Sequence, residues 1–195
     1  MTFEGLDGSG KTTQAKLLAE ALRAEGHDVV TTREPGGTPL GEQIRELLLN
    51  GKDMSAWAEA ALFAAARAEL AERVIAPALE AGKPVVCDRY VDSSLAYQGI
   101  ARGLGVEQVL ELNEHAIRGL LPDRTFLVLV DPATAAARAR SSDRIEREGD
   151  DFHRQVDRAY RELATMFPDR IVAVDGERPR DQIAEEIRGR VRQLS

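Results

Sequence analysis

The stretch EGLDGSGKTT occupies residues 4–13, close to the start of the sequence. Gly5 to Thr12 fit the pattern G-x-x-x-x-G-K-[ST], placed after a predicted strand and before a predicted helix, which is the context that this motif requires. Glycines permit positive φ angles and let backbone N–H groups approach phosphate oxygens, and the following helix adds its positive dipole end. The stretch therefore predicts a phosphate-binding loop and an α/β fold.

Individual residues of this loop have separate predicted roles. Lys11 supplies a charge to the outer phosphates of a nucleotide, and Thr12 offers a hydroxyl ligand to Mg²⁺, which prefers oxygen ligands. A glycine-rich turn that binds nothing is the alternative, and the complete motif argues against it. The loop residues predicted to bind ATP are Gly5, Asp7, Gly8, Ser9, Gly10, Lys11, Thr12 and Thr13.

Short apolar runs alternate with longer helical patterns along the chain, which is typical of a parallel sheet covered by helices on both faces. We predict five strands, at 1–4, 28–32, 84–88, 125–131 and 171–175. We predict helices at about 11–25, 39–50, 55–80, 92–101, 106–119, 132–140, 150–166 and 180–193. The fold class is therefore α/β, a three-layer P-loop fold with the strand order 2-3-1-4-5.

Length and charge limit the possible functions. The 195 residues suit one domain, 1–195. The net charge of −7 argues against a general nucleic-acid binder, because such domains usually carry a basic surplus. No apolar run approaches the roughly 18 residues of a membrane span, and the N-terminus lacks the pattern of a signal peptide. We expect a cytoplasmic protein with a local anion site.

The first predicted strand has at most four residues before the glycine loop, whereas strands usually have five or six. Either this strand is short or the start is trimmed. We expect a few additional apolar residues upstream to stabilise the fold, as a higher melting temperature would show.

Two segments after other strands are candidates for the second substrate, since ligands of open α/β sheets lie beyond the carboxyl ends of the strands. The first is TREPGGT at 32–38, and the second begins with Asp88 and Arg89. Arg89 has the forked geometry that binds a phosphate, and Asp88 is a candidate ligand for Mg²⁺ or its water. Taken alone, the Asp-Arg pair fits a local ion pair equally well.

Five stretches together resemble the bacterial thymidylate kinase family, whose members pass the γ-phosphoryl of ATP to dTMP. They are FEGLDGSGKTT (3–13), TREPGGT (32–38), LFAAARAEL (62–70), DRYVDSSLAYQG (88–99) and DRIE (143–146). The resemblance covers nearly the whole chain. It implies a kinase that uses ATP with Mg²⁺, and family members are commonly homodimers.

The resemblance also implies a dTMP site. The implied residues are Glu34, Pro35, Phe63, Arg67, Arg89, Ser94, Tyr97 and Gln98. Phe63 and Arg67 lie four apart on one helical face, as a ring that stacks on thymine and a donor to its carbonyl require. Tyr97 matches the residue that crowds the 2′ position of the sugar. Asp7 matches a loop carboxylate near the sugar and the metal-linked water.

A lid of about 138–150 is predicted to supply a catalytic arginine. The variable positions of the phosphate loop are Leu-Asp-Gly-Ser, without a basic residue. The transferring phosphoryl group needs cationic stabilisation, and family members whose loop lacks arginine carry it in the lid. Arg144 is the first candidate, Arg140 the second and Arg147 the third. The predicted catalytic residues are thus Lys11, Arg89, Arg144 and Asp7.

Two other functions stay open from the sequence. One is a kinase for another nucleoside monophosphate or a nucleoside. The other is a non-catalytic nucleotide-binding switch, which would leave TREPGG and DRY without a purpose. The absence of a guanine-reading N-K-x-D motif makes the switch less favoured.

Overall fold

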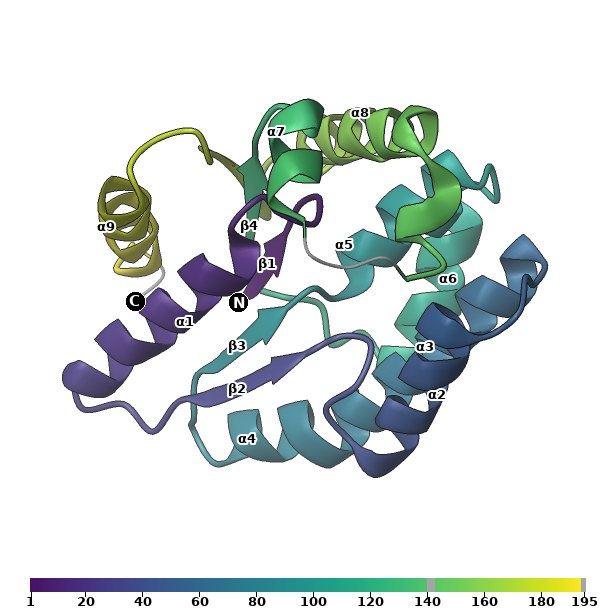
Figure 1. The fold of residues 1–195 in the computed structure, drawn as a ribbon. Coiled ribbons are helices and arrows are strands. Elements are labelled where there is room, and N and C mark those ends of the chain that lie inside the picture. The colour runs from purple at the N-terminus through teal and green to yellow at the C-terminus, as the bar shows by residue number, and fades with distance from the viewer. Residues whose placement is uncertain (140–142, 194–195) are drawn as a thin grey trace.

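A computed structural model describes residues 1–139 and 143–193. Its strands are β1 (Thr2–Glu4), β2 (Val30–Arg33), β3 (Val85–Asp88), β4 (Thr125–Leu129) and β5 (Ile171–Asp175). They form one parallel sheet in the order β2-β3-β1-β4-β5, with β1 at the centre (Figure 1). The predicted strands and their order are confirmed.

The helices follow the predicted alternation. They are α1 (Lys11–Ala24), α2 (Pro39–Asn50), α3 (Ala56–Leu70), α4 (Ala76–Glu80), α5 (Val91–Ser94), α6 (Val106–Ile117), α7 (Pro132–Arg138), α8 (Asp150–Met166) and α9 (Arg180–Val191). A π-helical segment, η1 (Ala71–Ile75), joins α3 to α4, and another, η2 (Leu95–Ala101), extends α5. A short 3₁₀ turn, η3 (Glu146–Glu148), precedes α8. The predicted helix 55–80 is therefore one continuous run with a π-helical middle.

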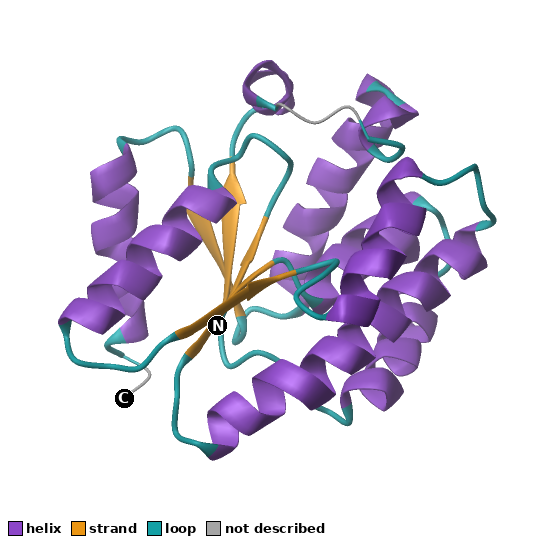
Figure 2. Cartoon of the chain, turned by 60° about the horizontal axis from the view of Figure 1, so that its bottom comes forward, coloured by secondary structure: helices purple, strands orange, loops and turns teal. Residues whose placement is uncertain are grey.

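Helices cover both faces of the sheet (Figure 2). On one face, α1 and α9 pack on the sheet, and Leu18 and Ile183 are buried there with Phe3 and Phe126. On the other face, α8 and η2 pack closely on each other above β4 and β5. Each fully buried large apolar side chain contributes about 1.5–3 kcal/mol of transfer free energy, so both layers hold the sheet in place.

β1 has only three residues, yet both of its edges are paired. Phe3 is in register with Asp88 of β3 and with Phe126 of β4. The amino group of Met1 donates to the carbonyl oxygen of Val85 at 3.0 Å. The stabilising effect of an upstream extension stays a prediction.

Two glycines set the course of the phosphate loop after β1. Gly5 has φ 138°, and a Cβ there would lie 2.5 Å from the carbonyl oxygen of Val128. Gly8 has φ 85°, and a Cβ there would collide with the backbone of Ala135 in α7. A side chain at either position would be strained and would clash. The loop is therefore seated between β4 and α7.

Candidate active site

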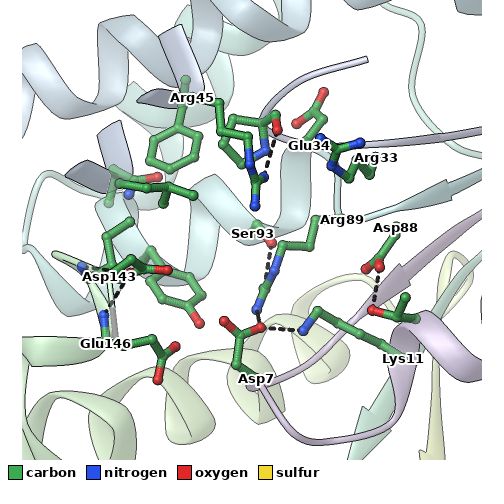
Figure 3. Close-up of a pocket in the computed structure, with 17 residues that line it drawn as sticks. Asp7, Lys11, Arg33, Glu34, Arg45, Asp88, Arg89, Ser93, Asp143 and Glu146 are labelled. Carbon is green, nitrogen blue, oxygen red and sulfur yellow. Dashed lines mark hydrogen bonds and ion pairs between the residues drawn. The ribbon is translucent and has the colours of Figure 1, made fainter. Parts of the chain in front are cut away.

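A cavity of about 270 Å³ opens at the carboxyl ends of β1, β2 and β3, as expected for an open α/β sheet (Figure 3). Its walls come from the phosphate loop, the turn after β2, α3, η2 and the segment 143–146. The predicted site residues that line it are Asp7, Lys11, Thr12, Glu34, Pro35, Phe63, Asp88, Arg89, Tyr97 and Gln98. The fold thus brings together the predicted residues of both substrates.

The phosphate loop ends at the first turn of α1. Gly10 is the residue before the helix, with φ 95° and no side-chain cap on the first-turn N–H groups. Those N–H groups and the helix dipole suit an anion. Ser9 is buried in the loop with a hydroxyl that has no hydrogen-bond partner, and Thr13 is exposed in the first turn. The described loop therefore has the donors that a phosphate requires.

Asp7 lies between two cations. Its Oδ1 accepts from Lys11 Nζ at 2.6 Å and from Arg89 Nη2 at 2.6 Å. Burial alone would raise the pKa of Asp7, but Arg89 and Lys11 outweigh it and hold this pKa far below its ordinary range. Two cations and one carboxylate leave one net positive charge beside the cavity. We call Asp7, Lys11 and Arg89 the phosphate-loop cluster.

Arg89 has a backbone conformation that is unusual for a residue with a side chain. Its φ is 66°, in the left-handed region, which costs a non-glycine residue on the order of 1 kcal/mol. Its Nη1 donates to the hydroxyls of Ser93 and Tyr160, each at 3.1 Å. The guanidinium lies 5.5 Å from the ring centroid of Tyr97. These contacts fix the side chain toward Asp7 in Figure 3.

Glu4 supports Arg89 from behind, and the sequence analysis did not single it out. It is fully buried, and its carboxylate accepts from the backbone N–H of Tyr90 at 2.7 Å, the Ser93 hydroxyl at 2.6 Å and the Tyr160 hydroxyl at 2.9 Å. Burial, and then the charge of Asp92, raise the pKa of Glu4 to about 7. A glutamate at the end of a central strand was the available signal, since such a carboxylate needs buried partners.

Thr12 and Asp88, the two candidate metal ligands, lie in contact, and their role as ligands stays a prediction. Thr12 Oγ1 donates to Asp88 Oδ2 at 2.5 Å, and Asp88 Oδ1 is buried without a hydrogen-bond partner. Within the described residues, no group of three or more His, Cys, Asp or Glu side chains is placed to hold a metal. An oxygen pair that relies on phosphates and water for the other ligands fits Mg²⁺, which keeps much of its hydration.

Arg67 and Ser94 do not line the cavity. Arg67 is fully buried and donates four hydrogen bonds to protein acceptors, and its Nη2 also lies 2.6 Å from Glu34 Oε2 in an ion pair. The acceptors are Glu34 Oε2, Ser94 Oγ, Asn113 Oδ1 and the carbonyl oxygen of Tyr90. Donation from Arg67 to a base requires the exchange of one of these bonds. Glu34 Oε1 is buried without a partner, and Glu34 itself reaches the cavity.

Arg144, the first candidate for the catalytic arginine, also lies away from the cavity. Its Nη2 donates to Glu59 Oε2 at 2.6 Å and its Nε to the carbonyl oxygen of Leu48 at 2.9 Å. Its sequence neighbours Asp143 and Ile145 line the cavity instead. Arg140, the second candidate, lies outside the described residues. The catalytic role of a lid arginine stays a prediction.

Among the lining residues that were not predicted as site residues, Arg45 and Glu146 carry charge into the cavity. Arg45 of α2 donates from Nη1 to the carbonyl oxygen of Pro35 at 2.8 Å, and no sequence pattern pointed to it. Glu146 belongs to the DRIE stretch, which was the available signal. Burial, followed by the charge of Asp7, raises the pKa of Glu146 to about 7.

A phosphate loop on the central strand, beside an arginine-lined cavity for a second substrate, defines a kinase of the nucleoside monophosphate class. The sequence model of the thymidylate kinase family matches residues 3–187. The chain belongs to this family. Its reaction is that of the family, phosphoryl transfer to dTMP.

Individual relatives agree along nearly the whole chain. The thymidylate kinase of Synechococcus sp. (strain JA-3-3Ab) is 51% identical over 175 residues, which are 90% of this chain and 86% of the relative. That of Symbiobacterium thermophilum is 48% identical over 198 residues, covering 100% and 92%. The crystal structure of thymidylate kinase from Ehrlichia chaffeensis superposes with a TM-score of 0.82 at 34% identity, covering 98% and 96%.

Proposed function

We propose that dTMP binds in the cavity with its phosphate on Arg89, facing the γ-phosphate of ATP on Lys11, and that residues 1–195 act as one kinase domain. The observation that carries this proposal is the phosphate-loop cluster. Lys11 of the phosphate loop and Arg89, which directly follows the carboxyl end of β3, both pair with Asp7. The distances from Lys11 Nζ and from Arg89 Nη2 to Asp7 Oδ1 are 2.6 Å each. A γ-phosphate bound by Lys11 and a dTMP phosphate bound by Arg89 would replace or flank the Asp7 carboxylate. They would then lie close enough for direct phosphoryl transfer.

The reaction needs no strong base. The second pKa of a phosphate monoester is about 6, so the acceptor is mostly a dianion at pH 7. An oxygen of the dTMP phosphate forms a bond to the γ-phosphorus, and the bond from that phosphorus to the β–γ bridging oxygen breaks. The products are dTDP and ADP. Lys11 and Arg89 neutralise the charge on the phosphates in this step.

For Mg²⁺ we propose Thr12 and Asp88 as the protein contacts. Their oxygen pair and the unpartnered Asp88 Oδ1 support this assignment. When bound, the ion would neutralise charge on the outer phosphates of ATP. Asp88 would hold it directly or through its water.

For the base and sugar we propose Phe63, Tyr97 and Gln98, together with Glu34 and Pro35 of the turn after β2. All five line the cavity. Phe63 offers a ring for stacking, and Gln98 an amide for the base edge. Tyr97 would reject a ribose hydroxyl by filling the space beside the sugar. Arg67 and Ser94 support this wall from behind, and their direct contact with the base requires the bond exchange described above.

For the lid arginine we now favour Arg140 over Arg144. Arg144 is committed to Glu59 and Leu48. Arg140 follows Ala139, whose backbone nitrogen lies 2.9 Å from the place of a Cβ on Gly8. The described chain therefore passes the phosphate loop at Ala139, and we propose the next residue in the sequence, Arg140, as the arginine that binds ATP.

We also propose that the chain forms a homodimer in the cytoplasm. The support for a dimer is that two large apolar side chains on contacting helices, Leu47 of α2 and Trp57 of α3, are 54% and 49% exposed. A dimer interface would cover this apolar surface. Light scattering with Leu47→Glu tests it, and a wild-type monomer would contradict it. The support for the cytoplasm is the pair of nucleotide substrates. No helix within the described residues is long and apolar enough to cross a membrane.

A coupled ADP-release assay with ATP, Mg²⁺ and a panel of monophosphates tests the proposed site. We expect strong preference for dTMP over UMP, dCMP and AMP. Arg89→Ala and Asp88→Ala test the two proposed contacts, and the second variant should need more Mg²⁺ for half-maximal rate. Equal rates with all monophosphates would favour a less selective kinase, and no turnover would favour a nucleotide-binding switch.

A further inference from the structure

Glu59 is a buried carboxylate that the proposed reaction does not use. It lies on α3 with 1% of its surface exposed, four residues before Phe63 and therefore on the same helical face. Gln98, Arg102 and Arg144 all donate to it. We call these three residues and Glu59 the Glu59 cluster. A buried anion with this many donors has a task in the fold or in the site.

Each oxygen of Glu59 accepts two hydrogen bonds. Oε1 accepts from Gln98 Nε2 at 2.9 Å and from Arg102 Nε at 3.3 Å. Oε2 accepts from Arg144 Nη2 at 2.6 Å and from Arg102 Nη2 at 3.3 Å. Burial alone would raise the pKa of Glu59, but these donors outweigh it and hold the pKa below its ordinary value. Glu59 is therefore an anion at neutral pH.

The donors tie the segment 143–148 to the helices around the cavity. Arg144 also donates from its backbone N–H to the carbonyl oxygen of Leu49, at the end of α2, at 2.8 Å. Arg102 also donates to Glu148 Oε1 at 2.6 Å. Residues of α3, of η2 and its end, and of the segment 143–148 thus meet at one carboxylate, and Arg144 links them to α2 through the carbonyl oxygens of Leu48 and Leu49.

Every one of these parts contributes a wall of the cavity. Leu49, Phe63, Gln98 and Ile145 line it. Gln98 belongs to the Glu59 cluster, and Phe63 lies one helical turn after Glu59. Ile145 follows Arg144 directly, and Leu49 accepts the hydrogen bond from the Arg144 backbone. A displacement of about 1 Å in residues that position a substrate can lower the rate about 100-fold. The positions of these four lining residues, in the cavity proposed for dTMP, therefore depend on the contacts of Glu59.

We propose that Glu59 is a positioning residue for the acceptor, which acts through Arg144 and Gln98 to hold the segment 143–148 and η2 at the cavity. Arg144 then acts as an ion-pair partner of Glu59 rather than as the catalytic arginine. The inference rests on the assignment of the cavity to dTMP.

The test measures steady-state kinetics and melting temperatures of Glu59→Gln, Arg144→Met and the double variant. The control is Glu186→Gln on α9, which removes ion pairs with Arg178 and Arg190, and none of these three residues lines the cavity. We expect each single variant to raise KM for dTMP about tenfold or more, with KM for ATP within about twofold of the wild type. The double variant should be no worse than the worse single one, because both changes break the same contact.

Three results would overturn the proposal. One is an unchanged KM for dTMP with only a lower melting temperature, which a purely structural role produces. The second is a double variant in which KM for dTMP rises by the product of the two single-variant increases. The third is a loss of kcat of about 100-fold in Arg144→Met, with KM for dTMP unchanged and Glu59→Gln unaffected, which a catalytic Arg144 predicts.

A milder variant keeps the test decisive where Arg144→Met does not fold. Arg144→Lys retains a cation for Glu59 but loses the planar fork that reaches Leu48 as well. We expect its KM for dTMP to stay within about threefold of the wild type, and a rise as large as that of Glu59→Gln would contradict the proposal. Failure of the dTMP assignment itself would appear separately, as a wild-type enzyme without turnover of dTMP.

Discussion

Two clusters, each with two cations around one carboxylate, contain residues that line the same cavity. In the phosphate-loop cluster, two cations share Asp7, whose side chain is 32% exposed. In the Glu59 cluster, two cations share a carboxylate whose side chain is only 2% exposed. The charged groups pair in a similar way, but Asp7, Lys11 and Arg89 all line the cavity, whereas Glu59, Arg102 and Arg144 do not and Gln98 alone connects their cluster to it.

The difference shows that the partner of an arginine determines what the arginine is free to bind. Arg89 is held by one carboxylate and two hydroxyls, an arrangement that leaves the group beside open space where a phosphate fits. Arg144 is held by a buried carboxylate and a backbone carbonyl. Charge-assisted bonds in a dry environment are costly to break. The open cluster suits catalysis, and the closed cluster suits positioning.

The largest expected effect concerns Lys11 in the open cluster. Lys11→Met removes a charge that stabilises the transferring phosphoryl, so kcat should fall by about three orders of magnitude. The unfolding free energy should change little, because Asp7 keeps its contact with Arg89. Single-turnover kinetics and urea denaturation measure the two quantities. A variant that loses stability but keeps turnover would place Lys11 with the structural residues.

In the closed cluster the same kind of change should act on stability in addition to its effect on KM for dTMP. Glu59→Gln leaves Arg144 buried without a compensating charge, and we expect the unfolding free energy to fall by about 3 kcal/mol. Urea denaturation at pH 7 measures it. The control Glu186→Gln breaks a more exposed ion pair and should cost less than about 1 kcal/mol. Equal losses in both variants would mean that burial does not distinguish the Glu59 cluster.

The pH dependence of stability should separate the two sides further. The pKa of Glu4, behind Arg89, is raised to about 7, whereas the pKa of Glu59 is lowered. Between pH 4.5 and about 7 the folded protein holds a proton on Glu4 that the unfolded chain releases, so this group makes stability fall as pH rises. For Glu59, the stabilisation is present above its unfolded pKa and is lost as pH falls.

Urea denaturation at several pH values checks this difference. Wild type should lose on the order of 2 kcal/mol relative to Glu4→Gln as pH rises from about 4.5 to 7. The other charged and titratable groups near Glu4 are Asp92, Arg89, Tyr160, Glu34 and Cys87, and they are present in both proteins. The deficit of Glu59→Gln should instead shrink toward low pH. Parallel curves for Glu4→Gln and wild type would contradict the raised pKa.

The sequence predicted the open cluster better than the closed one for a physical reason. The loop 5–12 is a local pattern whose spacing fixes its backbone, and the carboxyl ends of parallel strands bring Asp88 and Arg89 to it. The strand order and most helix bounds followed from periodicity. The direction of Arg144 depends on Glu59, which is 85 residues away. Pattern and spacing within one segment contain no information about that partner.

The smallest expected effect concerns the aromatic side chain that contacts an arginine in each cluster. The Arg89 guanidinium lies 5.5 Å from the ring centroid of Tyr97, and that of Arg102 lies 4.6 Å from the ring of Phe152. A cation–π contact of this kind contributes about 1 kcal/mol. Tyr97→Phe keeps the ring and should leave kcat/KM for dTMP within about twofold, while Tyr97→Leu should lower it about fivefold more.

Phe152→Leu is the matched change on the closed side, where the same loss should appear in the unfolding free energy. The rings of Tyr97 and Phe152 pack edge to face with their centroids 6.1 Å apart, so some coupling between the two sites is expected. The double variant measures this coupling in both kinetics and denaturation. If Phe152→Leu lowers kcat/KM for dTMP as much as Tyr97→Leu does, the closed cluster contributes to catalysis as directly as the open one, and the distinction between them fails.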